Sequence, residues 1–313
     1  MLWVLKGQEK VKALENLRET SARKLYRLLS ERLEEKENKN YLVGDRITLA
    51  DFRVFSFYQL AIRELEPMAL GSLLGEFPVL YRYINWQKHH EFNSYLRSGR
   101  DKELGISAEE RKVIDQIYDY WFNIQDLNPV GVNLKPYMRR WYNGGEQVDN
   151  ECRAFEEHVE KARIGEYDHW AKEPYGRLAL ILLLDQFTRN IYRKSSKAFS
   201  GDEKAIQLTL DAIEKGWFWL YSHLERTFFL MPLMHAEDRK LADMSQEYFK
   251  KHSEQANLLY PGLDQGGNDL VWADKHRDII LQFGRYPYRN EVLGRETTPE
   301  EEKYLKNGER FGQ

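Results

Sequence analysis

One segment of the chain is apolar on every side of a helix, and it limits the folds that the chain can adopt. Leu178–Leu184 reads Leu-Ala-Leu-Ile-Leu-Leu-Leu with no polar residue between. A helix with this pattern is buried all round, either in a protein core or in a membrane. Because a membrane span needs roughly 20 apolar residues, and no longer apolar run exists in the sequence, we expect a buried core helix and no membrane segment.

Helical spacing recurs through the rest of the chain. Ile114, Ile117 and Trp121 fall on one helix face, with polar residues between them. No segment shows the regular alternation of apolar and polar residues that is typical of a half-buried strand. The sequence therefore predicts an all-α fold.

The length of 313 residues favours two domains, because single cores rarely grow beyond about 300 residues. Ser98–Gly105 contains two glycines and four charged residues and offers little to bury, which is typical of a linker. Ser107 and Glu110 then form a capping box that starts a new helix. We expect a first helical domain over 1–98, a linker over 99–106 and a second helical domain over 107–313.

Composition excludes several classes of function. The 47 Lys and Arg residues against 50 Asp and Glu leave a formal charge of -3, so no global field would hold a nucleic acid. Cys152 is the only cysteine in the sequence, and it cannot form an internal disulfide. Since the first ten residues also lack the pattern of a signal peptide, we expect a cytoplasmic protein.

The first domain carries a helix pattern followed by a strong helix start. Leu25, Leu28 and Leu33 belong to a predicted amphipathic helix over about 11–33, with the leucines on the packed face. Thr48 can cap a second helix, while Asp51 binds the exposed amides from the other side.

These residues resemble a motif of the glutathione transferase C-terminal domain, in which "GD-x-[TS]-x-AD" opens the central buried helix. Gly44, Asp45, Thr48, Ala50 and Asp51 carry the resemblance, which covers about the first 95 residues. It implies a helical domain but no transferase activity, because a working enzyme also needs a thioredoxin-like domain and the chain begins too late to contain one. The implied role of residues 1–98 is docking to a partner protein.

Three segments of the second domain place polar residues beside apolar helices: Arg177–Arg193, Phe228–Asp238 and Trp272–Arg295. They resemble the signature stretches of the uncharacterised bacterial domain of unknown function numbered 924, over residues 110 to 306. That family implies a tetratricopeptide-like helical fold and no assigned reaction. The chain departs from its pattern at Thr188, Ala236 and Tyr288, where the pattern has Pro, Ser and His. It shares the polar positions Asp185, Gln186, Arg189, Asn190, Arg193, His235, Glu237, His276, Arg285, Arg289, Asn290 and Arg295.

These polar positions admit two interpretations. Arginine forks match the oxygens of phosphate or carboxylate, so a pocket of Arg and His would bind an anionic small molecule, and His235, Glu237 or His276 would be the catalytic candidates. The remaining nine positions would then bind the ligand. Alternatively, Asp185 and Arg189 form an ordinary helix pair and the loop arginines stabilise helix ends.

Other site chemistry is not expected. His235 and Glu237 lack the spacing of a zinc-binding HExxH motif, and the chain has no glycine-rich phosphate loop, so we predict neither a metal nor a cofactor. The leading hypothesis is a helical adaptor or binding protein with a docking first domain and an anion-accepting pocket in the second. The alternative is an enzyme of unknown reaction class acting on an anionic small molecule, and binding to structured RNA is a third, weaker hypothesis.

Overall fold

The computed structural model describes residues 16, 18–44, 46–54, 76–87, 100–122, 135–259 and 265–311. Every regular element in these ranges is helical, which confirms the all-α prediction. The chain divides into two compact units. The first holds the described residues up to Arg100 together with Ala212–Ser222, and the second holds those of Asp101–Gln125, Pro129–Asp211 and His223–Gln313.

The first unit contains α2 (Arg23–Glu34), which follows a π-helical turn (Arg18–Ala22) and packs against α5 (Pro78–Trp86). The buried face of α2 consists of Tyr26, Ser30 and Leu33. Leu25 and Leu28 lie on its exposed face, with 37% and 55% of their surface accessible. The predicted packing of these two leucines was therefore wrong, because the buried stripe of α2 is centred on Tyr26, which meets Phe77 edge-on at 6.0 Å between ring centroids.

The predicted helix start near Thr48 is confirmed. The carboxylate of Asp51 is fully buried and accepts hydrogen bonds from the backbone amide of Thr48 at 2.8 Å and from its hydroxyl at 2.7 Å. The same carboxylate accepts from the amide of Leu42 at 2.7 Å and from the hydroxyl of Tyr83 at 3.0 Å. Asp51 thus joins the start of one helix to the side of α5.

The second unit begins at Asp101, the second residue of α7 (Arg100–Leu104), and this helix lies within the expected linker range. Its residue Asp101 accepts a hydrogen bond from Nε of Arg111 at 2.9 Å, so this segment is tied to the helix that follows. That helix, α8 (Ala108–Trp121), starts with the predicted capping box between Ser107 and Glu110.

The predicted core segment forms α12 (Pro174–Ile181) and a π-helical continuation (Leu182–Phe187), followed by α13 (Thr188–Ile191). All seven residues of Leu178–Leu184 are fully buried, as expected. This segment packs against α8 and α15 (His223–His235), and α15 packs in turn on α16 (Arg239–Leu259) and α17 (Gln265–Phe283).

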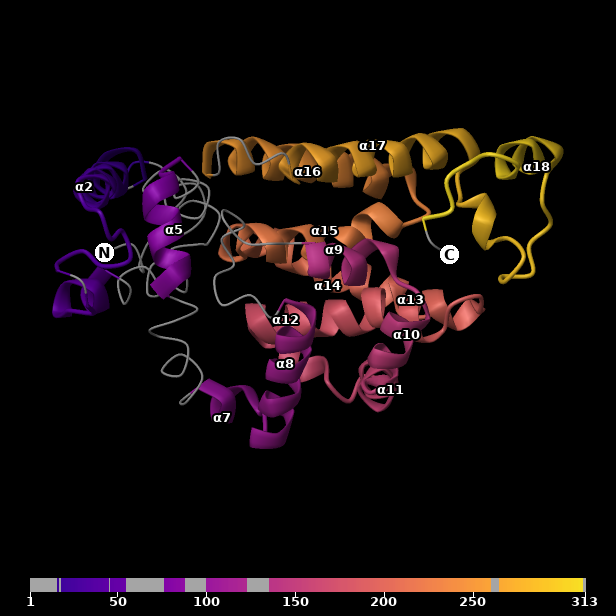
Figure 1. Cartoon of the computed structure of the whole chain (residues 1–313), viewed down its shortest axis with the longest axis horizontal. Coiled ribbons are helices and arrows are strands. Elements are labelled where there is room, and N and C mark those ends of the chain that lie inside the picture. The colour runs from indigo at the N-terminus through magenta and orange to yellow at the C-terminus, as the bar shows by residue number, and fades with distance from the viewer. Residues whose placement is uncertain are drawn as a thin grey trace. The chain divides into compact units, whose positions relative to one another are not determined.

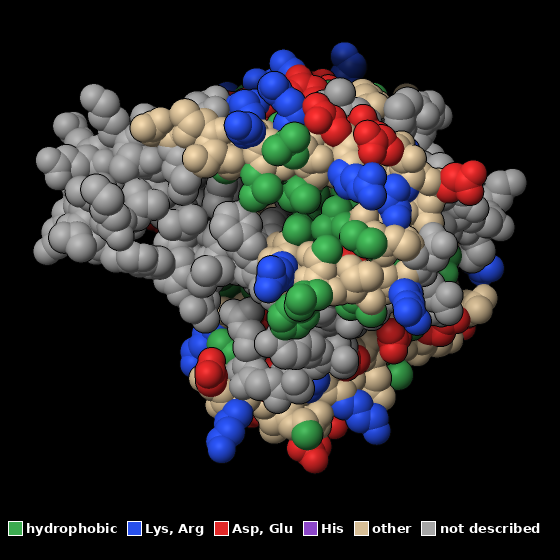
Figure 2. All heavy atoms as spheres, turned by 90° about the vertical axis from the view of Figure 1, so that its left-hand side faces the viewer, with side chains coloured by type: hydrophobic (Ala, Val, Ile, Leu, Met, Phe, Trp, Pro, Cys, Tyr) green, Lys and Arg blue, Asp and Glu red, His purple; other side chains and the backbone are tan. Residues whose placement is uncertain are grey.

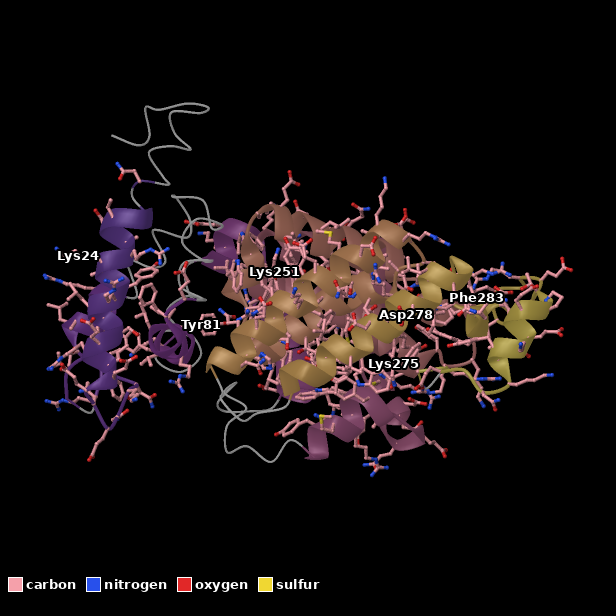
Figure 3. The ribbon with its side chains drawn as sticks, turned by 90° about the horizontal axis from the view of Figure 1, so that it is seen from above. Lys24, Tyr81, Lys251, Lys275, Asp278 and Phe283 are labelled. Carbon is pink, nitrogen blue, oxygen red and sulfur yellow. The ribbon has the colours of Figure 1, made fainter. Side chains whose placement is uncertain are left out.

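Helices α16 and α17 lie side by side along one edge of the second unit (Figure 1). Seen from above, Lys251 projects from α16, and Lys275, Asp278 and Phe283 follow one another along α17 (Figure 3). Beyond Phe283 the chain turns at Gly284, whose φ of +72° is the left-handed conformation that glycine favours at a helix end. The α17 end packs around a core of Ala242, Ile279, Ile280 and Tyr286.

Shorter helices complete the second unit. No helix among the described residues combines the length and apolar character that a bilayer span requires. The remaining elements of the second unit are α9 (Lys135–Met138), a π-helix (Arg139–Asn143), α10 (Glu146–Arg153), α11 (Glu156–Ile164), α14 (Asp202–Glu214), α18 (Pro299–Leu305) and the 3-10 helices Asp168–Lys172, Ser196–Phe199 and Pro287–Arg289. The end of α14, from Ala212, falls in the first unit. The 3-10 helix Trp217–Leu220 falls in the first unit.

Candidate functional site

The structure brings His235, at the end of α15, against Asp185 of the buried π-helical segment. Nδ1 of His235 lies 2.8 Å and 3.1 Å from the two carboxylate oxygens of Asp185. Asp185 is fully buried, and its carboxylate also accepts from the side-chain amide of Gln186 at 2.5 Å. Because an ionised carboxylate can only accept, Nδ1 of His235 carries the hydrogen of this bond.

A second feature of His235 is its other ring nitrogen, Nε2. Within the described part of the chain, Nε2 takes part in no hydrogen bond, and it is not among the polar atoms that are both buried and unpaired. The side chain is 14% exposed. His235 therefore presents an unprotonated Nε2 toward the surface while Asp185 fixes its ring from behind.

Two arginines and a second carboxylate complete this group. Arg189 lies 3.1 Å from Asp185 and 2.9 Å from Asp202, at the start of α14. Arg289 reaches the same Asp202 at 3.3 Å and donates to the backbone carbonyl of His235 at 3.0 Å. Two guanidinium groups thus face two carboxylates, and the group carries no net charge when His235 is neutral.

Burial sets the protonation of this group. It lowers the pKa of His235, against the opposing pull of the Asp185 carboxylate, so the imidazole is neutral at pH 7. Burial alone would raise the pKa of Asp185, but the charge of Arg189 and the hydrogen bond from His235 hold it below its ordinary value. The dyad is therefore a carboxylate paired with a neutral imidazole.

Arg289 is held by aromatic rings as well as by ions. Its guanidinium carbon lies 4.4 Å from the ring centroid of Phe199 and 4.5 Å from that of Tyr286. Only 3% of the residue is exposed, and its Nε is buried without a partner. A cation placed over two rings is stabilised by their negative faces, which fixes Arg289 in place.

His276 of α17 lies beside His235, with 5.9 Å between the ring centroids. Its Nδ1 donates to the backbone carbonyl of Trp272 at 2.7 Å, and its ring stacks on Phe311 at 3.7 Å. Burial lowers the pKa of His276 to about 3, so this imidazole is also neutral.

Glu237 and Arg295 form a second group. The two carboxylate oxygens of Glu237 accept from Arg295 at 2.5 Å and 3.0 Å, and one of them also accepts from the amide of Tyr286 at 2.8 Å. Burial raises the pKa of Glu237, but the hydrogen bonds from Arg295 and Tyr286 lower it further than burial raises it. Glu237 is thus ionised and engaged in holding the loop after α17.

Arg285 and Asn290 form a third group around Glu301. Arg285 donates to both carboxylate oxygens of Glu301, at 2.7 Å and 2.8 Å, and Asn290 donates to one of them at 3.0 Å. The same carboxylate closes the capping box of α18 by accepting from the amide of Thr298. These bonds, first that of Arg285, lower the pKa of Glu301 to about 2.

Arg193 and Asn190 lie in a fourth group. Arg193 donates to both oxygens of Asp149 on α10 at 2.9 Å, and to the side chain of Asn190 at 3.1 Å. Asn190 in turn donates to the backbone carbonyl of Gln186 at 2.9 Å. This group joins α10 to α13.

The predicted residues are thus distributed over four bonded groups. The first brings together Asp185, Gln186, Arg189, His235 and Arg289, with His276 beside it. Sequence reasoning missed the acceptors Asp202, Asp149 and Glu301, which lie far along the chain from the arginines that they bind. Glu301 was visible only as part of the acidic start of α18, and Asp202 only as an acidic residue at the start of α14.

Comparison with known families shows to which family the chain belongs. Residues 117–309 match the family model described as bacterial protein of unknown function, DUF924. The chain belongs to the DUF924 family. All twelve predicted site positions lie inside the DUF924 match. Residues 2–86 match the model of the glutathione S-transferase C-terminal domain, so the predicted fusion of the two families is confirmed.

A solved relative has the same domain. The structure of a protein of unknown function from Agrobacterium tumefaciens is 32% identical in sequence, with a TM-score of 0.50. The match covers 63% of this chain and 99% of that one. No curated protein matches the chain.

Cys152 of α10 is buried. Burial raises the pKa of Cys152 to about 12, so its thiol stays protonated at pH 7. Among the residues that the structure describes, no three His, Cys, Asp or Glu side chains come together in a way that would hold a metal ion.

Proposed function

We propose that the DUF924 domain binds a small polar molecule at His235 and that this imidazole acts on it as a general base. A single observation carries the proposal: Asp185 holds Nδ1 of His235, while Nε2 is free of partners in the described part of the chain. A carboxylate that fixes the tautomer and orientation of a histidine is the usual support of a catalytic imidazole.

The protonation state agrees with this role. A general base must be unprotonated at the working pH, and burial lowers the pKa of His235. The alternative interpretation treats the pair as structural, since buried ion pairs also perturb titration without any function. The Nε2 that has no partner among the described residues favours the functional interpretation, because it leaves a hydrogen-bond acceptor for a ligand.

Fewer arginines are left to bind a ligand than the sequence predicted. Arg285 is engaged by Glu301 and Arg295 by Glu237, each through both carboxylate oxygens. Arg289 alone of the three donates to the backbone of His235. We therefore place the binding site at His235 and Arg289, and we assign Arg285 and Arg295 to the support of the surrounding loop.

A thermal-shift screen tests this proposal. Wild-type protein and His235→Asn are screened against phosphorylated, carboxylated, amine-containing and polyhydroxylated metabolites, because a ligand that binds only the folded state raises Tm. Asn keeps a donor for Asp185 and removes Nε2. His169→Asn, at a histidine that is 25% exposed beside Glu110, is the matched control. A ligand that shifts the wild type and the control but not His235→Asn supports the site, whereas equal shifts in all three contradict it.

Docking to a partner polypeptide is a second candidate function, carried by the first unit. Six of the twelve large hydrophobic residues that are exposed in the described part of the chain fall between positions 25 and 52. The view from the side of α2 shows hydrophobic side chains gathered at the surface among charged ones (Figure 2). These six are Leu25, Leu28, Val43, Ile47, Leu49 and Phe52.

Contiguous exposed apolar residues are typical of a protein interface. Crosslinking in cells of the source organism, followed by mass spectrometry on the full chain, tests the adaptor role. Leu28→Glu with Leu49→Glu should remove a specific partner, and Leu293→Glu, at a residue 36% exposed in the second unit, should retain it. Crosslinks to a second copy of the chain, or crosslinks unchanged by the double variant, would contradict it.

A further inference from the structure

His235 and His276 present the same chemical group side by side. Each ring donates from Nδ1 to a fixed acceptor, the Asp185 carboxylate in one case and the Trp272 carbonyl in the other. Each therefore keeps its lone pair on Nε2, and neither Nε2 has a partner among the described residues. The ring centroids are 5.9 Å apart. The pair offers two hydrogen-bond acceptors and no donor.

Packing and hydrogen bonds keep both rings in the tautomer in which Nε2 is the acceptor. His276 is 5% exposed, stacked on Phe311 and edge-on to Tyr286 at 5.8 Å, so its ring cannot turn to exchange its two nitrogens without repacking. Its bond to Trp272 lies within α17, four residues away. Protonation is also opposed, because burial lowers the pKa of both histidines.

The charges around the pair exclude two classes of ligand. Arg189 and Arg289 are matched by Asp185 and Asp202, so no surplus positive charge is left to hold an anion. Two lone pairs would also repel carboxylate or phosphate oxygens. An ammonium group would find no surplus negative charge either, because the two carboxylates are matched by the two guanidinium groups. A neutral ligand meets neither obstacle.

We infer that the ligand of this site is a neutral molecule with two adjacent hydroxyl groups, one donating to Nε2 of His235 and the other to Nε2 of His276. This inference rests on the proposed function, since it names the ligand class of the same site. It assigns His276 and His235 as the residues that accept the hydrogen bonds of the two hydroxyl groups. Specificity follows because a group without hydrogens to donate would leave both nitrogens unpaired.

Nitrogen NMR on the full chain with 15N-labelled histidine tests the inference. In the free protein both Nε2 atoms should resonate as unprotonated nitrogens at pH 7. The probes are myo-inositol, ribose and catechol as vicinal diols, with methanol, inorganic phosphate, acetate and ethylamine as comparisons. A bound diol should shift both Nε2 signals and raise Tm by about 5 °C or more at about 100 times its Kd.

Variants separate this inference from the proposed function. His276→Asn keeps a donor for the Trp272 carbonyl and removes Nε2, so it should weaken diol binding about tenfold or more, as should His235→Asn. His169→Asn should bind like the wild type. Diol binding that needs His235 but not His276, or phosphate binding that needs His235, would overturn the inference and leave the proposed function standing. A protonated Nε2 on either ring in the free protein would overturn the inference directly. If none of the probes binds, both proposals fall.

Discussion

The carboxylate of Asp185 accepts a hydrogen bond from Nδ1 of His235, 50 residues later in the chain, at 2.8 Å. The acceptor is fully buried and the donor is 14% exposed on its side chain, so the pair runs from the core of the DUF924 domain toward its surface. Arg189 neutralises the same carboxylate from the other side. The orientation and the tautomer of His235 both depend on this contact.

Replacing Asp185 with Asn should destabilise the domain and change His235. The substitution leaves the buried Arg189 with one carboxylate fewer, and removing one partner of a buried ion pair typically costs about 3–5 kcal/mol. The Asn amide can donate to Nδ1, so the hydrogen of the imidazole should move to Nε2. Urea unfolding measures the first effect and nitrogen NMR measures the second.

Asp243→Asn is the control for this variant. Asp243 pairs with Arg277 at 2.6 Å, but the two side chains are 57% and 34% exposed. Exposed pairs contribute about 0–1 kcal/mol, so this variant should unfold near the wild-type urea concentration. Equal losses of unfolding free energy in the two variants would show that the buried Asp185 pair contributes no more to stability than the exposed Asp243 pair.

Gly201→Ala should destabilise the start of α14. A Cβ at this position would lie 2.2 Å from the carbonyl oxygen of Leu184, a backbone atom that cannot move without disturbing the buried core segment. Overpacking of this kind costs about 1–3 kcal/mol. The neighbouring Ser200→Ala removes only an exposed hydroxyl that donates to Lys197 and should change stability by less than about 0.5 kcal/mol. Thermal unfolding of the two variants side by side checks the difference.

Asp269 should make stability fall as the pH rises. Burial raises its pKa to about 6 from 3.8, although Thr227 donates to it at 2.7 Å, so the folded state binds a proton more tightly than the unfolded chain. Stability contributed by this proton is present below pH 4 and is lost as the pH rises to about 6. The loss is on the order of 3 kcal/mol.

Asp269→Asn removes this titration. The free energy of unfolding of the variant, measured relative to that of the wild type, should therefore rise between pH 4.5 and pH 8. The stacked pair of His223 and His252, whose pKa values burial lowers, titrates in the opposite direction but is present in both proteins. Denaturant unfolding at several pH values gives the difference, and a difference that does not vary with pH would be inconsistent with a buried, proton-binding Asp269.

Thr298→Ala should weaken the attachment of α18. The Thr298 hydroxyl accepts from the amide of Glu301 at 3.3 Å and forms half of a capping box. Loss of such a cap costs about 1 kcal/mol. Hydrogen exchange of the α18 amides should accelerate about fivefold in the variant, while the amides of α12 should exchange as in the wild type.

Features that depend on near neighbours could be predicted from the sequence. The capping boxes at Ser107 and Thr298, the end of α17 at Gly284 and the burial of Leu178–Leu184 follow from residues within one or two helical turns. The packing of Leu25 and Leu28 was predicted wrongly, because the spacing of the leucines along α2 does not show which face of the helix packs against α5.

The four-residue spacing of Asp185 and Arg189 indicated their ion pair, found at 3.1 Å, but the more distant partners of the site residues could not be predicted. Arg193 binds Asp149 and Arg295 binds Glu237, at separations of 44 and 58 residues. No local pattern links such positions, because tertiary packing decides which carboxylate lies opposite each guanidinium. The motifs identified the polar residues, and the fold determined which of them are paired and which nitrogen is free.

A pH titration of the His235 ring nitrogens by NMR tests the central claim most directly. We predict that near pH 7 Nδ1 carries the hydrogen and Nε2 does not, and that the pKa of His235 lies below 6.5. The Asp185→Asn variant should reverse the tautomer. A hydrogen on Nε2 in the wild type, or a His235 that is protonated at pH 7, would contradict the account.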